Sequence, residues 1–225
     1  MRGVLVAGGT GALGAGVLRA LLDGGHPVTT TWLVDRERDR VEQEFGDRVA
    51  LVEADLMEQA GADAAVAATP DIGAVVNLVG GFSMGPRAHE IELESYEKML
   101  RLNLVPGFTL VRAAFPSMLQ TGGAYVGVSA RPALKPFPGA AAYVTAKAAV
   151  LAFVRALDAD YAKDGIRSNA ILPSVIDTPA NRAATPDADF SKWVQPDDIG
   201  RVVRFLVSEE SAPTSGAAVP VYGRA

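Results

Sequence analysis

Val4-Leu5-Val6-Ala7-Gly8-Gly9-Thr10-Gly11-Ala12-Leu13-Gly14 is the stretch that decides the fold. Four apolar residues, typical of a buried strand, lead directly into a glycine-rich loop, and a segment of helical periodicity follows from Gly14. Glycines let a backbone turn tightly and approach a pyrophosphate, whose charge is favoured at the N-terminus of the next helix. A plain structural turn is the alternative, but the place between a first strand and a first helix favours a dinucleotide-binding loop.

Short apolar segments alternate with longer helical patterns along the whole chain. The expected strands cover residues 4–7, 28–34, 49–52, 74–78, 124–128, 167–172 and 218–221. The expected helices cover residues 14–24, 36–45, 61–68, 93–120, 142–163 and 196–208. Strands that are apolar on both faces and alternate with helices predict one α/β domain over residues 1–225, a doubly wound parallel sheet with helices on both faces. Residues 131–139 and 180–192 are predicted to be loops long enough to be functional.

The composition limits the partners. The chain has 49% hydrophobic residues, a net charge of −5 and no cluster of Lys and Arg, so no nucleic-acid partner is expected. The absence of cysteine excludes disulfides and thiol chemistry, and His26 and His89 lack metal-ligand spacing, so no metal is expected. No stretch approaches the ~20 apolar residues of a membrane span. The apolar segment near the N-terminus, residues 4–7, is too short for the hydrophobic region of a signal sequence. No membrane partner and a cytoplasmic location are therefore expected.

A tyrosine and a lysine lie one helical turn apart in Tyr143-Val144-Thr145-Ala146-Lys147. On a helix both side chains leave the same face. A nearby cation favours the phenolate and lowers the pKa of a tyrosine from its usual value of ~10, so the pair is a candidate proton donor and acceptor. For an isolated pattern of this length, an ordinary helix surface is the usual interpretation. The rest of the chain therefore has to decide between a helix surface and a catalytic pair.

Together with the glycine loop and the alternation of strands and helices, this pair makes the chain resemble the short-chain dehydrogenase/reductase family over essentially its whole length. The resemblance implies a Rossmann-like fold, an NAD(P)(H) cofactor, and hydride transfer between the nicotinamide and a carbonyl or alcohol. Tyr143 and Lys147 match the family's active pair, and Lys147 would also hold the nicotinamide ribose. Asn103 is similar to the helix asparagine that joins the family's proton relay.

The resemblance also implies a set of cofactor contacts. Those in the glycine loop are Gly8, Thr10, Gly11, Ala12, Leu13 and Gly14, with Ala12 in place of the usual glycine. Asn77-Leu78-Val79-Gly80 looks like a degraded form of the family's Asn-Asn-Ala-Gly strand end and would supply Val79 and Gly80. A segment that resembles the family's cover over the nicotinamide would supply Pro173, the backbone of Ile176 and the hydroxyl of Thr178.

The sequence leaves the choice between NAD and NADP open. Asp35 is a candidate acid for the ribose hydroxyls at the end of the second strand, whereas Arg36 is a candidate partner of a 2′-phosphate. Both are equally compatible with solvated loop charges. Asp55 and Leu56 come after the third expected strand and are expected cofactor contacts, since an acid there could accept a hydrogen bond from the adenine amine.

The serine is the main departure from the family pattern. The family's serine usually lies thirteen residues before the tyrosine, which is Ala130 here, and Ser129 comes one residue too early. A slip of one residue along a strand turns a side chain to the opposite face. Residues 131–139 could absorb the shift, so the sequence leaves open whether Ser129 or Ala130 faces the site. Ser129 is the candidate donor to the substrate carbonyl.

Three functions remain after these comparisons of residues. A carbonyl or alcohol oxidoreductase is expected first. A dihydropteridine reductase-type activity is the second, because that branch of the family tolerates alanine at this position and is similar at residues 11–14, 79–82, 177–182 and 186–193. A non-catalytic dinucleotide-binding sensor is the third. In this family the two long helices pair with a second subunit, so the resemblance implies a homodimer or homotetramer acting on a small-molecule substrate.

Overall fold

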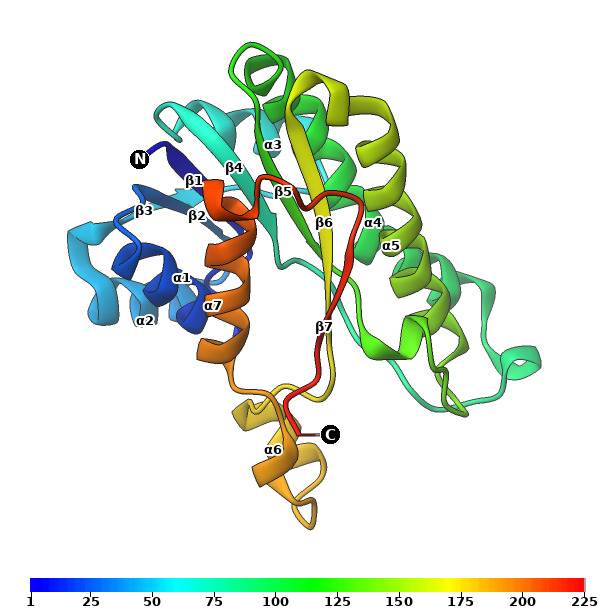
Figure 1. Cartoon of the computed structure of the whole chain (residues 1–225). Coiled ribbons are helices and arrows are strands. Elements are labelled where there is room, and N and C mark those ends of the chain that lie inside the picture. The colour runs from blue at the N-terminus through cyan, green and yellow to red at the C-terminus, as the bar shows by residue number, and fades with distance from the viewer. Residues whose placement is uncertain (225) are drawn as a thin grey trace.

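A parallel sheet of seven strands forms the centre of the computed structural model, which describes residues 1–224. The strand order is β3-β2-β1-β4-β5-β6-β7 (Figure 1). The strands are β1 Gly3–Ala7, β2 Val28–Trp32, β3 Val49–Glu53, β4 Ile72–Asn77, β5 Gly123–Val128, β6 Ile166–Pro173 and β7 Ala218–Val221. The predicted fold class and all seven predicted strands are confirmed. Because the order reverses direction between β1 and β4, their carboxyl ends form the switch point at which such sheets bind ligands.

Helices cover both faces of the sheet. They are α1 Gly14–Asp23, α2 Asp35–Phe45, α3 Gln59–Ala67, α4 Leu93–Met118, α5 Ala141–Tyr161, α6 Pro179–Ala184 and α7 Pro196–Val207. One apolar core joins α1, α2 and α7 to the sheet, and a second core joins α3, α4 and α5 to its other face (Figure 1). The six predicted helices are confirmed with small shifts of their ends.

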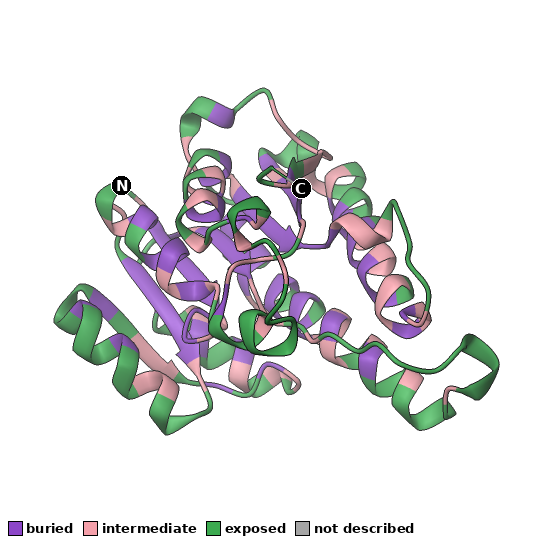
Figure 2. Cartoon of the chain, turned by 90° about the horizontal axis from the view of Figure 1, so that it is seen from below, coloured by how far each residue is buried: buried purple, intermediate pink, exposed green. Residues whose placement is uncertain are grey.

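The strands divide their residues between the two cores. Val4 and Val6 of β1 belong to the core beneath α1, whereas Leu5 belongs to the core beneath α4. This alternation follows from the two-residue period of a strand and explains why β1 is apolar throughout. Buried residues accordingly follow the strands and the inward sides of the helices (Figure 2). Within residues 1–224, no helix has the length and apolar character needed to cross a membrane.

Two predicted boundaries are wrong. β2 ends at Trp32, two residues before the predicted end, so that Asp35 becomes the first residue of α2. The predicted loop 180–192 contains the short helix α6 and a 3-10 turn at Phe190–Lys192. Thr178 caps α6 by accepting the Asn181 N–H, and a proline follows at the first helical position. Six residues are too few to show helical periodicity. In the sequence, only the capping threonine followed by a proline indicates this helix.

The two helices α1 and α7 meet at glycines. A Cβ atom added to Gly16 would lie 2.3 Å from the Pro196 carbonyl carbon, and one on Gly200 would lie 2.2 Å from the Gly16 oxygen. Both distances are far below van der Waals contact, so the helices approach so closely only because these side chains are absent. This contact fixes α7 against the helix that follows the glycine loop.

Gly16→Ala is therefore expected to lower the free energy of unfolding by about 1–3 kcal/mol, the usual cost of overpacking. Urea denaturation monitored by circular dichroism measures this effect. Gly85→Ala is the matched control, because no atom lies within 4 Å of the position of its added Cβ. Equal stability of the two variants would show that α1 and α7 separate at little cost.

Candidate active site

The glycine loop and the end of β4 touch at the switch point. The Leu78 N–H donates to the Ala7 carbonyl at 2.9 Å, which continues the pairing of β1 with β4. Gly8 has a φ of +72°, and a Cβ there would lie 2.9 Å from Val79 Cγ2. The predicted cofactor residues Gly8 and Val79 are thus brought together at the carboxyl edge of the sheet.

The loop has the features of a cradle for a pyrophosphate. A Cβ on Gly14 would lie 1.8 Å from the Gly9 oxygen, and one on Gly9 would lie 2.3 Å from Thr30 Oγ1. The Gly11 N–H donates to the Gly8 carbonyl at 3.1 Å, which tightens the turn. No side chain caps the N-terminus of α1, where Ala12 is exposed and Leu13 occupies the cap position. The uncapped N–H groups suit an anion, so these residues fit a dinucleotide.

The adenosine end differs from the prediction. Asp35 and Arg36 are exposed in the first turn of α2, and Asp35 is paired with Arg38 at 2.7 Å. Trp32 ends β2 in the place expected for the acid, and the Arg38 guanidinium lies 4.7 Å from the centre of its ring. The predicted choice between Asp35 and Arg36 as readers of the ribose therefore stays untested, and neither is at the strand end.

Two other side chains of α2 reach the glycine loop. Glu37 Oε2 lies 3.4 Å from the buried Thr10 hydroxyl, and the Arg40 guanidinium donates to the Thr10 carbonyl. The sequence reasoning missed both residues. Their spacing, which puts them on one face of a helix, was the available signal.

Asp55 and Leu56 have different environments. Asp55 is exposed, and one of its oxygens accepts the Met57 N–H at 2.9 Å, which leaves the other oxygen free to accept from a ligand. Leu56 is buried in the core beneath α4, and its carbonyl accepts the Thr109 hydroxyl at 2.8 Å. Asp55 therefore fits the predicted role, while the Leu56 side chain serves packing.

Lys147 is buried at the carboxyl end of β5. Its ammonium donates to the Val128 carbonyl at 2.9 Å, and burial lowers its pKa to about 8. A Cβ on Gly80 would lie 3.0 Å from this ammonium and 2.5 Å from Asn103 Oδ1. Three predicted site residues, Lys147, Asn103 and Gly80, therefore converge on one point, and glycine is the residue that leaves room for the other two.

Tyr143 contradicts one expectation. Burial raises the pKa of its phenol to about 12, whereas the sequence predicted that Lys147 would lower it. The tyrosine ring stands edge-on to Phe82, with ring centres 4.9 Å apart, and the lysine ammonium is bound to a strand carbonyl. Removal of the phenol from water raises its pKa because burial disfavours the charged phenolate.

Asn103 joins α4 to the loop after β4. Its Oδ1 accepts the Gly81 N–H at 3.3 Å, and its Nδ2 donates to the Met99 carbonyl at 2.9 Å. The side chain is 2% exposed. Asn103 thereby holds residues 80 and 81 beside Lys147, as the predicted grouping requires.

Ser129 links the end of β5 to α5, and its predicted role as donor to the substrate carbonyl stays a prediction. Its buried hydroxyl donates to the Lys147 carbonyl at 2.7 Å. A serine hydroxyl has one proton, and here that proton holds α5 to the end of β5. This geometry supports a positioning role for Ser129, and Ala130 has no donor to offer in its place.

A buried tyrosine beneath the site escaped the sequence reasoning. The Tyr125 hydroxyl is hydrogen-bonded to Asn77, and burial raises its pKa to about 12. Asn77 Oδ1 in turn accepts the Val79 N–H at 3.1 Å. A Cβ on Gly107 would lie 2.8 Å from the Tyr125 oxygen, so α4 closes over this pair. A tyrosine within an apolar strand looks like an ordinary core residue in the sequence. No motif there predicts that Tyr125 supports the residues before Gly80.

The segment after β6 crosses back over the carboxyl edge. Pro173 ends β6, and Ile176 forms an isolated bridge with Val194. The Ile176 carbonyl accepts the Asn181 side-chain amide at 2.8 Å. Thr178 is buried, and although its oxygen caps α6, its hydroxyl proton remains available to a ligand. Thr178 and the cover segment thus fit the predicted cofactor contacts.

Asp177 fastens this segment. Its side chain, 5% exposed, is paired with Arg182 and accepts the Gln195 amide at 2.7 Å. The hydrogen bond from Arg182 is the main cause that lowers the pKa of Asp177 to about 2. Because the folded pKa lies below the ordinary value, the fastening is complete above about pH 4 and is lost as pH falls toward 2.

Asp177→Asn is expected to loosen residues 178–195 at neutral pH, because the charge that Arg182 and Gln195 share is removed. Amide hydrogen exchange across this segment should become clearly faster. Asp198→Asn is the control, since Asp198 forms an exposed pair with Arg201 on α7. Unchanged exchange in Asp177→Asn would show that other contacts hold the segment.

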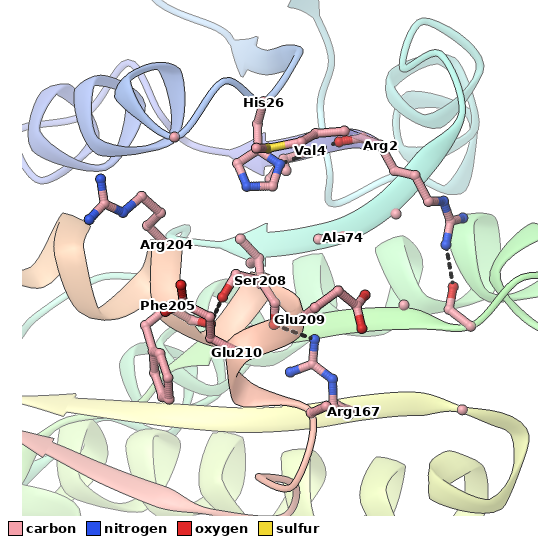
Figure 3. Close-up of a pocket in the computed structure, with 18 of the residues that line it drawn as sticks. Arg2, Val4, His26, Ala74, Arg167, Arg204, Phe205, Ser208, Glu209 and Glu210 are labelled. Atoms are coloured by element: carbon pink, nitrogen blue, oxygen red, sulfur yellow. Dashed lines mark hydrogen bonds between the residues drawn. The ribbon is translucent and has the colours of Figure 1, made fainter.

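A large cavity lies at the opposite edge of the sheet (Figure 3). It has a volume of about 1050 Å³ and is lined at the amino ends of the strands by Val4, Ala74 and Arg167. Arg2 donates to the Gly122 carbonyl at 2.9 Å, and Arg167 donates to the Leu206 carbonyl at 2.9 Å. These arginines are used to satisfy backbone carbonyls, so the cavity is not the predicted site.

Comparisons with known proteins agree with this geometry. Residues 8–223 match the family model described as Enoyl-(Acyl carrier protein) reductase. The chain is 32% identical to 2-(R)-hydroxypropyl-CoM dehydrogenase of Xanthobacter autotrophicus, over 80% of this chain and 78% of the relative. It is 28% identical to 4-formylbenzenesulfonate dehydrogenase of Comamonas testosteroni, over 72% and 69% of the two chains.

A solved structure shows the same fold. A short-chain type dehydrogenase/reductase from Mycobacterium ulcerans superimposes with a TM-score of 0.92 at 22% identity, over 99% of this chain and 89% of that one. The chain therefore belongs to the short-chain dehydrogenase/reductase family. The predicted family and the predicted class, an NAD(P)-dependent oxidoreductase acting on alcohol and carbonyl groups, are confirmed. Similarity to the dihydropteridine reductase branch stays a prediction.

Proposed function

We propose that this chain transfers a hydride between NAD(P)(H) and a carbonyl or alcohol substrate, with Tyr143 exchanging the proton. The observation that carries the proposal is the convergence of Lys147, Asn103 and Gly80 beside Tyr143, at the carboxyl edge that also holds the glycine loop. The nicotinamide, when bound, gives or takes the hydride, and the residues described below do the remaining work.

The cofactor is held by residues at the carboxyl edge of the sheet. They are Gly8, Thr10, Gly11, Ala12, Leu13 and Gly14 at the pyrophosphate, Asp55 at the adenine, and Val79, Gly80, Lys147, Pro173, Ile176 and Thr178 toward the nicotinamide. The uncapped start of α1 favours the anionic centre of the dinucleotide. Glu37 and Arg40 lie against Thr10 and are the charged groups best placed to read the 2′ position of the ribose.

The ionisation states favour reduction of a carbonyl. With a pKa raised to about 12, the Tyr143 phenol carries its proton at neutral pH and is ready to donate it to a carbonyl oxygen. Lys147, whose pKa is lowered to about 8, still holds most of its charge there and can orient ribose hydroxyls. Ser129 acts by fixing the backbone of Lys147.

Tyr143→Phe keeps the ring and removes the proton donor. The turnover number for carbonyl reduction is expected to fall by about 10²–10⁴, the usual contribution of a positioned general acid. Tyr161→Phe is the control, because Tyr161 ends the same helix and packs against Phe115 at 5.0 Å.

The measurement is oxidation of NADH and NADPH with a panel of ketones, aldehydes, quinones and quinonoid dihydropterin. Turnover of the dihydropterin alone would favour the pteridine-type alternative. Tight cofactor binding without turnover of any substrate would favour the sensor. A Tyr143→Phe variant that reduces carbonyls at the parent rate would remove Tyr143 from the mechanism.

The pH dependence of reduction is expected to follow Lys147. Since its folded pKa is about 8, the ammonium is present below that pH and is lost above it, so the rate should fall as pH rises through about 8. Tyr143 stays protonated throughout this range and does not cause the fall. Turnover measured from about pH 6 to 10 tests this, with Lys163→Met, an exposed lysine beyond α5, as the control. A rate that stays level up to pH 10 would contradict it.

The outer side of the two long helices supports a homo-oligomer. Phe108 is 52% exposed and Leu119 is 41% exposed on or just after α4. A hollow of about 300 Å³ between α4 and α5 is lined by apolar residues that include Phe115, Phe153 and Leu157. A second copy of this surface would cover these side chains in a dimer or tetramer. The cytoplasmic location remains a prediction of the sequence.

A further inference from the structure

Two loops form the rim beside Tyr143. Residues 79–87 follow β4, residues 131–140 follow β5, and the Gly85 N–H donates to the Gly139 carbonyl at 2.8 Å. Gly139 has a φ of +76°, and a Cβ there would lie 2.8 Å from the Gly85 oxygen. The two loops are therefore held in contact and form one continuous wall between the ends of β4 and β5.

This wall exposes large apolar side chains. Phe82 is 61% exposed, Met84 64%, Leu134 56% and Phe137 36%. None of them belongs to the buried cores, so packing of the fold does not account for them. Apolar groups gathered at the mouth of a site are typical of a surface that binds a ligand.

Phe82 connects this wall to the reacting proton. Its ring meets the Tyr143 ring edge-on at an angle of 76°. A substrate carbonyl that accepts the Tyr143 proton must therefore lie next to Phe82. A flat aromatic group beside that carbonyl would stack against the exposed part of the Phe82 ring.

The charge of the wall is one-sided. The wall, residues 79–87 and 131–140, contains Arg87, Arg131 and Lys135 and no acid, and Glu90 just after it accepts the Arg87 N–H at 2.8 Å. Arg131 is half-buried over the Tyr222 ring at 4.9 Å, and no carboxylate within residues 1–224 pairs with it.

The acids of the cover segment do not offset this charge. Asp177 is paired with Arg182, and Asp189 lies 3.5 Å from Lys192. Asp187 is exposed and is the remaining acid of that segment. The mouth of the site therefore combines an aromatic wall with Arg131, which pairs with no carboxylate of residues 1–224.

We propose that the substrate is a flat aromatic aldehyde or ketone that bears an anionic group. Its ring lies against Phe82, its carbonyl faces Tyr143, and its anion is attracted by Arg131. In reduction the hydride of the reduced nicotinamide adds to the carbonyl carbon and the Tyr143 proton adds to the oxygen, which gives the alcohol and the oxidised cofactor. This inference rests on the proposed function and narrows its substrate. The substrate in the name of one relative, 4-formylbenzenesulfonate, has this chemistry.

The experiment compares three benzaldehydes that differ only in charge at the para position: a sulfonate, a methyl group and a trimethylammonium group. Turnover is followed by oxidation of NADH and NADPH in the intact protein. The specificity constant is expected to be highest for the sulfonate and lowest for the cation. Equal constants for the three, or a preference for the cation, would overturn the role of charge.

Two variants test separately the ring contact with Phe82 and the charge of Arg131. Phe82→Ala should raise KM for the neutral and anionic benzaldehydes by about two- to tenfold, the value of one aromatic contact. Arg131→Met should lower the specificity constant for the sulfonate by roughly two- to fivefold and leave the neutral compound unchanged. Phe205→Ala and Arg204→Met are the controls, because both residues line the cavity at the opposite edge (Figure 3). A Phe82→Ala variant that behaves like Phe205→Ala would overturn the proposed ring contact.

Failure of this inference is distinguishable from failure of the proposed function. If aliphatic ketones are reduced in a Tyr143-dependent manner and none of the benzaldehydes is, the substrate class is wrong and the function stands. If no carbonyl compound of either kind is reduced while cofactor binds, both are wrong.

Discussion

The ammonium of Lys147 is buried at the end of β5 with a single strand carbonyl as its hydrogen-bond partner. A buried charge without a carboxylate is unfavourable, and the lowered pKa is the measure of that cost. The fold accepts the cost because α5 is fixed at the same point by a second bond, from the Ser129 hydroxyl to the Lys147 backbone. One residue is thus tied to β5 through both its side chain and its main chain. The direction of Tyr143, one turn earlier on α5, depends on this double attachment.

Glycines around Lys147 leave the space that the site needs. Gly80 makes room for Lys147 and Asn103, Gly8 makes room for Val79, and Gly14 makes room for the turn of the glycine loop. Larger side chains beneath the site support this backbone, as Tyr125 does through its hydrogen bond to Asn77. A site made in this way has little tolerance for displacement, because each glycine is in contact with a group that takes part in binding. The close contact of α1 with α7 through Gly16 extends the same principle to the scaffold.

The sequence predicted the fold because strand and helix periodicity are local properties, and it predicted Tyr143 with Lys147 because their spacing is one helical turn. It did not predict the phenol's pKa, since burial of Tyr143 involves Phe82, which lies sixty-one residues earlier in the chain. The end of β2 was predicted two residues too late, because periodicity locates such a boundary only within a few residues. The bond made by Ser129 depends on the distance between a strand and a helix, and no spacing along the chain encodes that distance.

The polarity of the fold explains why the carboxyl edge of the sheet favours an anion. In a parallel sheet with crossover helices, helix N-termini gather at the carboxyl edge and helix C-termini at the amino edge. The uncapped start of α1 lies beside the glycine loop, so that edge favours an anionic cofactor. At the other edge Arg167 donates to the Leu206 and Ser208 carbonyls at the end of α7, and Arg2 donates to the Gly122 carbonyl just before β5. A cavity of about 1050 Å³ lies there, and both arginines line it (Figure 3). The reactive edge is therefore selected by backbone dipoles and glycines, and the size of a cavity is a poor guide to it.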